Sequence, residues 1–179
     1  RINERNQLKL DYAAVRQNEV PRYDKYVSGE FEQFIYDPQN RDLAILSFES
    51  RQPLPVIYAL KTAFTYQYEV EGSTEQLAGS PKVFRSRDKL TSWGGYIQAM
   101  TLLGERHEFT YGAEYYRDKV SSRRMVDSAG IVETERPTYP DDSRYHSAGV
   151  FVQNRLLLAR RIYVTVGARL SVITTDAKL

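Results

Sequence analysis

The chain has 179 residues, of which 27% are charged, and its formal net charge is only +2. This length suits one domain of ordinary size, and the nearly balanced charge gives no support for a nucleic-acid partner. The sequence contains no cysteine, which excludes a disulfide framework and thiolate chemistry. Tyrosine is abundant, with 14 residues against seven Phe and one Trp. Because the tyrosine ring is amphipathic, this usage suits a tyrosine-rich β-protein or strands at a membrane interface.

No apolar run approaches the roughly 20 residues that a membrane-spanning helix requires. The sequence therefore excludes a helical membrane protein, but not a β-barrel, whose strands give a much weaker hydropathy signal. The first residues do not form a signal peptide, and Thr174–Leu179 breaks off within a pattern. We therefore expect both ends to be internal to a longer polypeptide.

Alternation of apolar and polar residues predicts about seven β-strands, many of them longer than the usual ~5–6 residues. The clearest pattern surrounds Tyr111–Asp118, where aromatic residues share one face and carboxylates share the other. In Arg87–Leu102 two sets of apolar residues compete for the outer face, one containing Tyr96 and the other Trp93. The predicted strands are Gln7–Arg16, Arg41–Ser50, Val56–Val70, Arg87–Leu102, His107–Lys119, Ser143–Leu158 and Arg161–Ile173.

The predicted connections alternate strictly between long and short. Polar, proline-bearing segments form the long ones, Gln17–Asn40, Glu71–Ser86 and Val120–Asp142, and the short ones are Arg51–Pro55, Leu103–Arg106 and Ala159–Arg160. In an antiparallel meander, all long connections then lie at one end of the sheet and all short ones at the other. Outer-membrane barrels show this asymmetry, whereas a soluble β-sandwich has no reason to sort its connections. The pattern favours a transmembrane β-barrel over a soluble β-sandwich.

Residue parity predicts which side chains face lipid and which face the barrel interior. The residues expected to face outward are Val56, Leu60, Phe64, Tyr111, Ala113, Val150, Val152, Val164, Val166 and Ala168. Those expected to face inward are Lys61, Glu69, Glu114, Gln153, Arg155 and Arg169.

Several short motifs, in this order and spacing, resemble the barrel of TonB-dependent outer-membrane receptors. The similarity extends from about Gln7 to Ile173, and the motifs together are fairly specific for that family. They are Val20–Asp24, Tyr36–Gln39 before Arg41–Ala44, Tyr111–Asp118, Gly149–Gln153 and Val166–Leu170.

The resemblance implies an all-β, antiparallel, up-and-down transmembrane barrel of about 22 strands, of which this chain supplies about seven. Residues 1–179 would form part of that barrel domain, while the plug domain and the TonB box are absent from this chain. The family imports scarce nutrients across the bacterial outer membrane, and its partners are outer-membrane lipid, the TonB complex through the missing N-terminal region, and the ligand. We expect an iron chelate, either haem or a ferric siderophore, and the Pro21–Asp24 and Asp37–Gln39 pattern resembles the haem-receptor branch. No resident cofactor or metal is expected.

Candidate site residues follow from these expectations. Aromatic and arginine side chains in or beside the long connections could contact the ligand, namely Arg22, Tyr23, Tyr139 and Arg144. Because the family has a plug, Glu114 and Arg169 are expected to contact it from the barrel wall. His107 and His146 are the only histidines, and an interface role is expected for both rather than haem ligation.

Catalysis finds little support, because the sequence has no nucleophile elbow, no phosphate-binding loop and no zinc-ligand spacing. We therefore do not expect an enzyme. The alternatives to an active transporter are a passive porin-type barrel and a soluble β-sandwich binding module.

Overall fold

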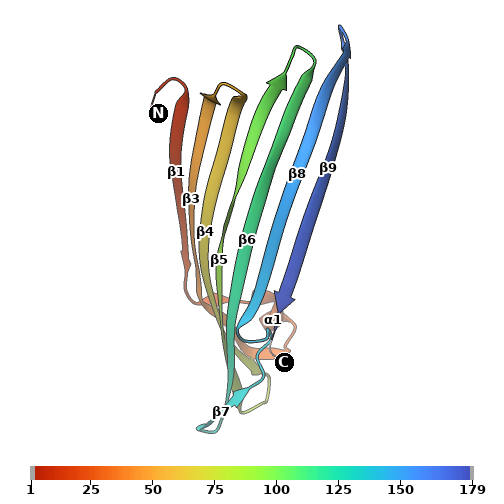
Figure 1. Cartoon of the computed structure of the whole chain (residues 1–179). Helices are drawn as coiled ribbons and strands as arrows, with labels where there is room; N and C mark the ends of the chain where they lie inside the picture. The colour runs from red at the N-terminus through yellow and green to blue at the C-terminus, as the bar shows by residue number, and fades with distance from the viewer. Residues whose placement is uncertain (1–2, 178–179) are drawn as a thin grey trace.

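The computed structural model describes residues 3–177, which form one open antiparallel sheet. Seven long strands lie side by side in the order β1-β3-β4-β5-β6-β8-β9 (Figure 1), and the two short strands β2 and β7 pair with β3 and β6. The strands are β1 Asn6–Gln17, β2 Val20–Pro21, β3 Phe31–Leu54, β4 Ile57–Leu77, β5 Lys82–Leu103, β6 His107–Ser128, β7 Ile131–Glu135, β8 Ser143–Ala159 and β9 Ile162–Asp176. The sheet confirms the all-β, up-and-down topology that the sequence predicts.

Helix is nearly absent, as expected: α1, Tyr23–Val27, is a single short turn between β2 and β3. Between residues 3 and 177, no helix is long and apolar enough to cross a membrane.

The three predicted long connections are mostly strand, so these parts of the sequence-based assignment are wrong. The first predicted connection contains β2, α1 and the start of β3 from Phe31. In the second, β4 continues to Leu77, and a short turn leads into β5 at Lys82. In the third, β6 continues to Ser128 and pairs with β7. These segments mix polar and apolar residues without a regular period of two, so they lack the alternation by which a half-buried strand is recognised. Backbone hydrogen bonding continues regardless of that pattern, because each strand is already aligned by its neighbour.

The asymmetry between the two ends of the sheet nevertheless holds. The turns β3–β4, β5–β6 and β8–β9 are two or three residues long and lie at one end, which we call the turn end. Strand extensions, α1 and β7 all gather at the opposite end, called here the extension end (Figure 1).

Proline disturbs β3 at two places without ending it. The register with β4 shifts between Tyr36 and Gln39, around Pro38, and again between Arg51 and Leu54. Proline cannot donate to the ladder, and such shifts accommodate it. Gly72 on β4 faces the first shift, where an added Cβ would meet the carbonyl of Asp37. The predicted break after Ser50 is therefore a local irregularity within one continuous strand.

The described residues contain almost no enclosed core. Phe34, Val70 and Ala99 are the buried apolar residues among them, whereas large apolar side chains are exposed along most of the strands. A water-soluble sandwich would bury such residues between two packed sheets, but here there is one sheet. An extended exposed apolar face is instead what a lipid-facing barrel wall requires.

Candidate functional site

The two faces of the sheet differ in chemistry, and the register confirms which residues share a face. The predicted outward residues within strands all lie on one side, which we call the apolar face, and all the predicted inward residues lie on the other, the polar face. Val56 is the exception, because it lies in the turn before β4. On β5 the register resolves the ambiguity: Trp93, Ile97 and Ala99 join the apolar face.

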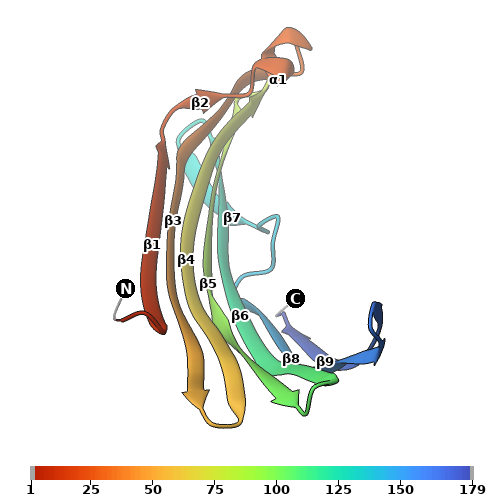
Figure 2. The same cartoon turned by 90° about the horizontal axis from the view of Figure 1, so that it is seen from above.

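Figure 2 shows that the sheet is strongly curved and that the segment between β7 and β8 lies within its hollow. Tyr139 belongs to this segment and lines a recess together with Leu90 and Val120, whose register places them on the polar face. The polar face is therefore the concave one, as in a barrel whose interior is wet.

The recess around Tyr139 is the clearest candidate binding site on the polar face at the extension end. Its volume is about 240 Å³, and apart from Tyr139 it is lined by Glu69, Glu71, Asp88, Leu90 and Val120, together with Lys89, whose position on β5 directs its side chain to the opposite face. The three carboxylates accept hydrogen bonds from neutral side chains, respectively Gln67, Gln39 and Ser122. Within residues 3–177 none of the three forms an ion pair. The recess therefore combines negative charge with an aromatic ring and two aliphatic side chains.

Sequence reasoning selected Tyr139 but missed the carboxylates that surround it. Glu71 lies in a stretch predicted to be a loop, and Asp88 lies on the strand whose faces were ambiguous. The available signal was that polar residues at alternate positions of β4 and β5 continue the inward parity set by Lys61 and Glu69.

Arg22 and Tyr23 lie at the start of α1, over β3. The Arg22 guanidinium forms a bidentate ion pair with Asp24, at 2.9 and 2.8 Å, donates to the Tyr36 hydroxyl at 3.2 Å and stacks over Phe34. These hydrogen bonds from Arg22 lower the pKa of Asp24 from its ordinary 3.8 to about 2. Arg22 thus holds the first extension in place, whereas Tyr23 is 74% exposed and its side chain makes no such contact among the described residues.

Arg144 occupies a different place from the other three loop candidates. Its register partners are Lys119 and Asp176, which puts it on the apolar side of the sheet beyond the apolar band. Its guanidinium donates to both carboxylate oxygens of Asp142, at 3.3 and 3.2 Å. Hydrogen bonds from Lys119 and then Arg144 hold the pKa of Asp142 below its usual value. The structure therefore does not bring Arg144 together with Tyr139 on the concave surface.

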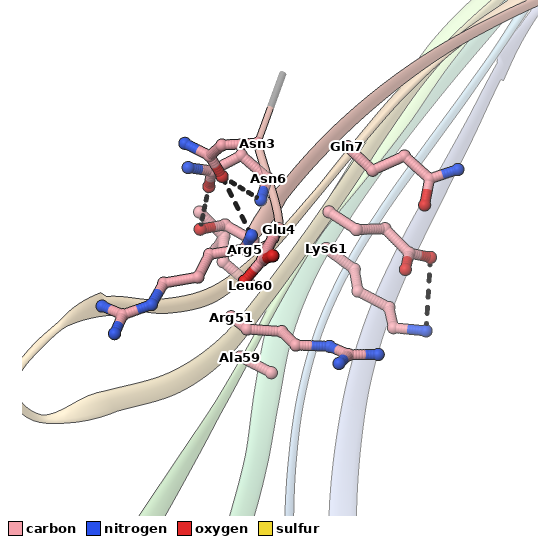
Figure 3. A pocket seen from close by; sticks show the side chains of 11 residues that line it. Asn3, Glu4, Arg5, Asn6, Gln7, Arg51, Ala59, Leu60 and Lys61 are labelled. Carbon is pink, nitrogen blue, oxygen red and sulfur yellow. Dashed lines mark hydrogen bonds and ion pairs between the residues drawn. The ribbon is translucent and has the colours of Figure 1, made fainter. Parts of the chain in front are cut away.

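A second recess, of about 180 Å³, lies at the turn end beside the unpaired edge of β1 (Figure 3). It is polar: Lys61 pairs with Glu49 at 3.4 Å, and the Ser50 hydroxyl donates to Asn6 at 2.6 Å. Glu49, Lys61 and Arg51 lie on the polar face. Because these charges pair with each other, the recess suits contact with another polar surface better than binding of a small molecule.

Glu114 and Arg169, the two candidate plug contacts, meet each other. The Arg169 guanidinium donates to Oε1 of Glu114 across the intervening strand β8, above Gly149. Both side chains project into the hollow of the sheet from its middle portion. Contact with a plug remains a prediction for both.

Both histidines lie on the apolar face. His107 is hydrogen-bonded to Asn154 at 3.0 Å, and His146 is hydrogen-bonded to the Tyr115 hydroxyl at 2.8 Å. In the described part of the chain, no group of three or more His, Cys, Asp or Glu residues could hold a metal ion.

A curved antiparallel sheet with one apolar face, one polar concave face and elaborated connections at one end has the features of the wall of an outer-membrane β-barrel. Residues 2–178 match the protein family described as TonB dependent receptor-like, beta-barrel, and the chain belongs to this family.

Two solved structures share this fold. One is the copper transporter OprC, with a TM-score of 0.75 and 14% sequence identity, matched over 98% of this chain and 27% of that one. The other is the ferric citrate transporter FecA in its unliganded form, with a TM-score of 0.66 and 14% identity, matched over 97% of this chain and 28% of that one. The chain thus spans little more than a quarter of each transporter. No curated protein matches it by sequence.

Proposed function

We propose that residues 1–179 form part of the barrel of an outer-membrane receptor that imports an iron chelate, haem or a ferric siderophore, with energy supplied through TonB. The family match over residues 2–178 carries this proposal. Such a receptor lies in the bacterial outer membrane, and its plug domain and TonB box belong to other parts of the polypeptide. The role of this segment is transport rather than catalysis.

The concave extension end supports a ligand-contacting role. Tyr139 and Tyr23 present aromatic rings on connections that project beyond the membrane-spanning band, and Arg22 braces the connection that carries Tyr23. We propose that Tyr139 and the carboxylates around it contact the chelate as it enters the barrel. Glu69, Glu71 and Asp88 form no ion pair with any of residues 3–177. This surface therefore suits a chelate with hydrogen-bond donors or positive charge better than a strongly anionic one.

Although the Pro21–Asp24 and Asp37–Gln39 pattern resembles the haem-receptor branch, we propose a ferric siderophore of the two chelate classes. Haem is commonly held by a histidine ligand. Here both histidines lie on the apolar face and bond to Asn154 and Tyr115, so neither offers its ring to the concave surface. The alternative of haem import then depends on ligands from other parts of the receptor.

The test uses the natural full-length protein in a bacterial strain that lacks its own iron receptors. Growth is measured with haem, with ferric siderophores of cationic and anionic charge, or with copper as the limiting metal source, each with and without TonB. We expect growth on a ferric siderophore that requires TonB. Uptake that persists without TonB or the proton-motive force would identify a passive porin-type barrel, and TonB-dependent uptake of copper alone would contradict the iron assignment.

The Tyr139→Ala variant locates the ligand contact within that assay. It should raise the siderophore concentration needed for half-maximal uptake while leaving receptor abundance unchanged. The matched control is Tyr163→Ala, because Tyr163 is also an exposed tyrosine but lies at the turn end beside Arg155. Equal effects of the two substitutions would contradict a ligand role for the Tyr139 recess.

A further inference from the structure

A cluster of basic side chains continues the apolar face beyond its aromatic border. Two neighbouring strands each carry the tripeptide Arg-Asp-Lys, at 87–89 on β5 and at 117–119 on β6. Strand alternation sends the aspartate of each tripeptide to the polar face and both cations to the opposite side. We call the resulting set the basic cluster; its members are Arg87, Lys89, Arg117, Lys119, Arg123 and Arg144.

Few carboxylates neutralise this cluster. Asp142 pairs with Lys119 at 3.1 Å and with Arg144 at 3.2 Å, and Asp141 lies near Arg123. Within the described residues Arg87, Lys89, Arg117 and Arg123 form no ion pair, and all of them except Arg117 are well exposed. The cluster therefore presents uncompensated positive charge on the side of the sheet that faces the membrane.

Exposed aromatic side chains indicate where the basic cluster lies relative to the membrane–water interface. Tyr66 and Trp93 are register partners, and the Trp93 ring packs against Tyr115 at 5.5 Å. Exposed Trp and Tyr side chains of this kind mark the membrane–water interface. Arg117 is the register partner of Trp93, so the basic cluster begins at the level of this aromatic row. Arg87 lies six positions beyond Trp93 on β5, which is about 20 Å along the strand. With a usual barrel tilt the cluster reaches about 15 Å beyond the aromatic row.

This height selects the type of lipid. The polar layer on each side of a phospholipid bilayer is only about 5–8 Å thick, so a phospholipid head group would reach Arg117 and Lys119 but not Arg87 or Arg123. Several cations spread over three strands also match several phosphates better than one. We propose that the basic cluster binds the head group of a multiply phosphorylated glycolipid in the membrane leaflet at the extension end. The phosphates accept hydrogen bonds from the arginine and lysine side chains, while the acyl chains lie along the apolar band below.

The experiment compares lipid binding by the full-length receptor and its variants in nanodiscs. Native mass spectrometry measures retention of lipopolysaccharide, of the same glycolipid after enzymatic dephosphorylation, and of phosphatidylglycerol. Replacing Arg87, Lys89, Arg117 and Lys119 together by Gln should weaken lipopolysaccharide retention at least about tenfold. The control is the Arg160→Gln, Arg161→Gln double variant, which removes exposed basic side chains at the turn end and should retain the glycolipid normally.

Folding is checked for every variant by the resistance of the barrel to heat in detergent gels. A milder double variant, Lys89→Gln with Arg117→Gln, keeps the comparison valid if the fourfold variant does not assemble. Unchanged retention in the assembled variants, or equal binding of the dephosphorylated glycolipid, would overturn the proposal. Equal competition by phosphatidylglycerol would show a site for any anionic lipid and would also overturn it. None of these outcomes depends on which nutrient the receptor imports.

Discussion

Arg169 of β9 and Glu114 of β6 form an ion pair across β8, directly above Gly149. The pair joins strands that do not hydrogen-bond to each other, because the missing side chain at Gly149 and the concave curvature bring the two groups together. Glu114 and Arg169 lie on the concave polar face, and their side chains remain 21% and 52% exposed. Solvent screening therefore limits the strength of the pair.

A double-mutant cycle measures this coupling. The substitutions Glu114→Gln and Arg169→Gln, alone and together, should give a coupling free energy of ~0.2–1 kcal/mol in urea unfolding from lipid bilayers. The coupling should shrink at high salt. Additive effects of the two substitutions would show that the pair contributes nothing to the stability of the barrel.

Glycines on the polar face differ in what an added methyl group would meet. At Gly94 an added Cβ would lie 2.4 Å from the Tyr115 carbonyl and 2.8 Å from the Tyr116 Cα, which are backbone atoms on β6. We expect Gly94→Ala to destabilise the barrel by about 1–3 kcal/mol through overpacking. Gly149→Ala is the matched comparison, because its Cβ would meet only side-chain atoms of Arg169 and Glu114, at 3.3 Å, and no backbone atom. Unfolding titrations should show a clearly smaller loss for Gly149→Ala, and equal losses would refute this explanation.

We expect the free-energy cost of introducing an arginine to depend strongly on whether the residue lies on the apolar or the polar face. Val150 lies in the central part of that face, with 53% of its surface exposed, and Gln153 lies nearby on the polar face of the same strand. Val150→Arg should cost ~2–4 kcal/mol in folding titrations into bilayers, because it places a charge near the lipid midplane. Gln153→Arg should cost far less. Val166 is also outward but nearer the turn end, so Val166→Arg should have an intermediate effect.

Acid should release the contact between Arg22 and Asp24. The pKa of Asp24 is lowered from 3.8 to about 2 by hydrogen bonds from Arg22, so the contact is fully present above pH 3.8 and is lost as the pH falls through about 2. A carboxyl-carbon NMR titration of aspartate-labelled receptor should show this depressed pKa. Arg22→Gln should return it toward 3.8, whereas Lys25→Gln, on the same helix, should leave most of the shift. An Asp24 carboxyl that titrates near 3.8 in the unmodified protein would contradict the contact.

Alternation in the sequence was sufficient to determine the strands and, except on β5, their two faces within the membrane-spanning band. From Leu60 to Val70 and from Ile162 to Val172, an apolar surrounding on one side and a polar one on the other impose a period of two on the side chains. The motifs around Tyr111–Asp118 and Gly149–Gln153 further indicated the TonB-dependent receptor family, which the match over residues 2–178 shows.

The strand pairing and the side-chain contacts at the extension end could be determined only from the tertiary structure. Beyond the membrane both faces of a strand meet water, so residues such as Thr74 and Arg124 carry no periodic signal although their backbones remain paired with β5. The ion pair above Gly149 and the closure of the Tyr139 segment over Glu69 also depend on contacts between residues far apart in the chain. Such contacts follow from sheet curvature and register, and neither quantity is encoded in any single stretch of sequence.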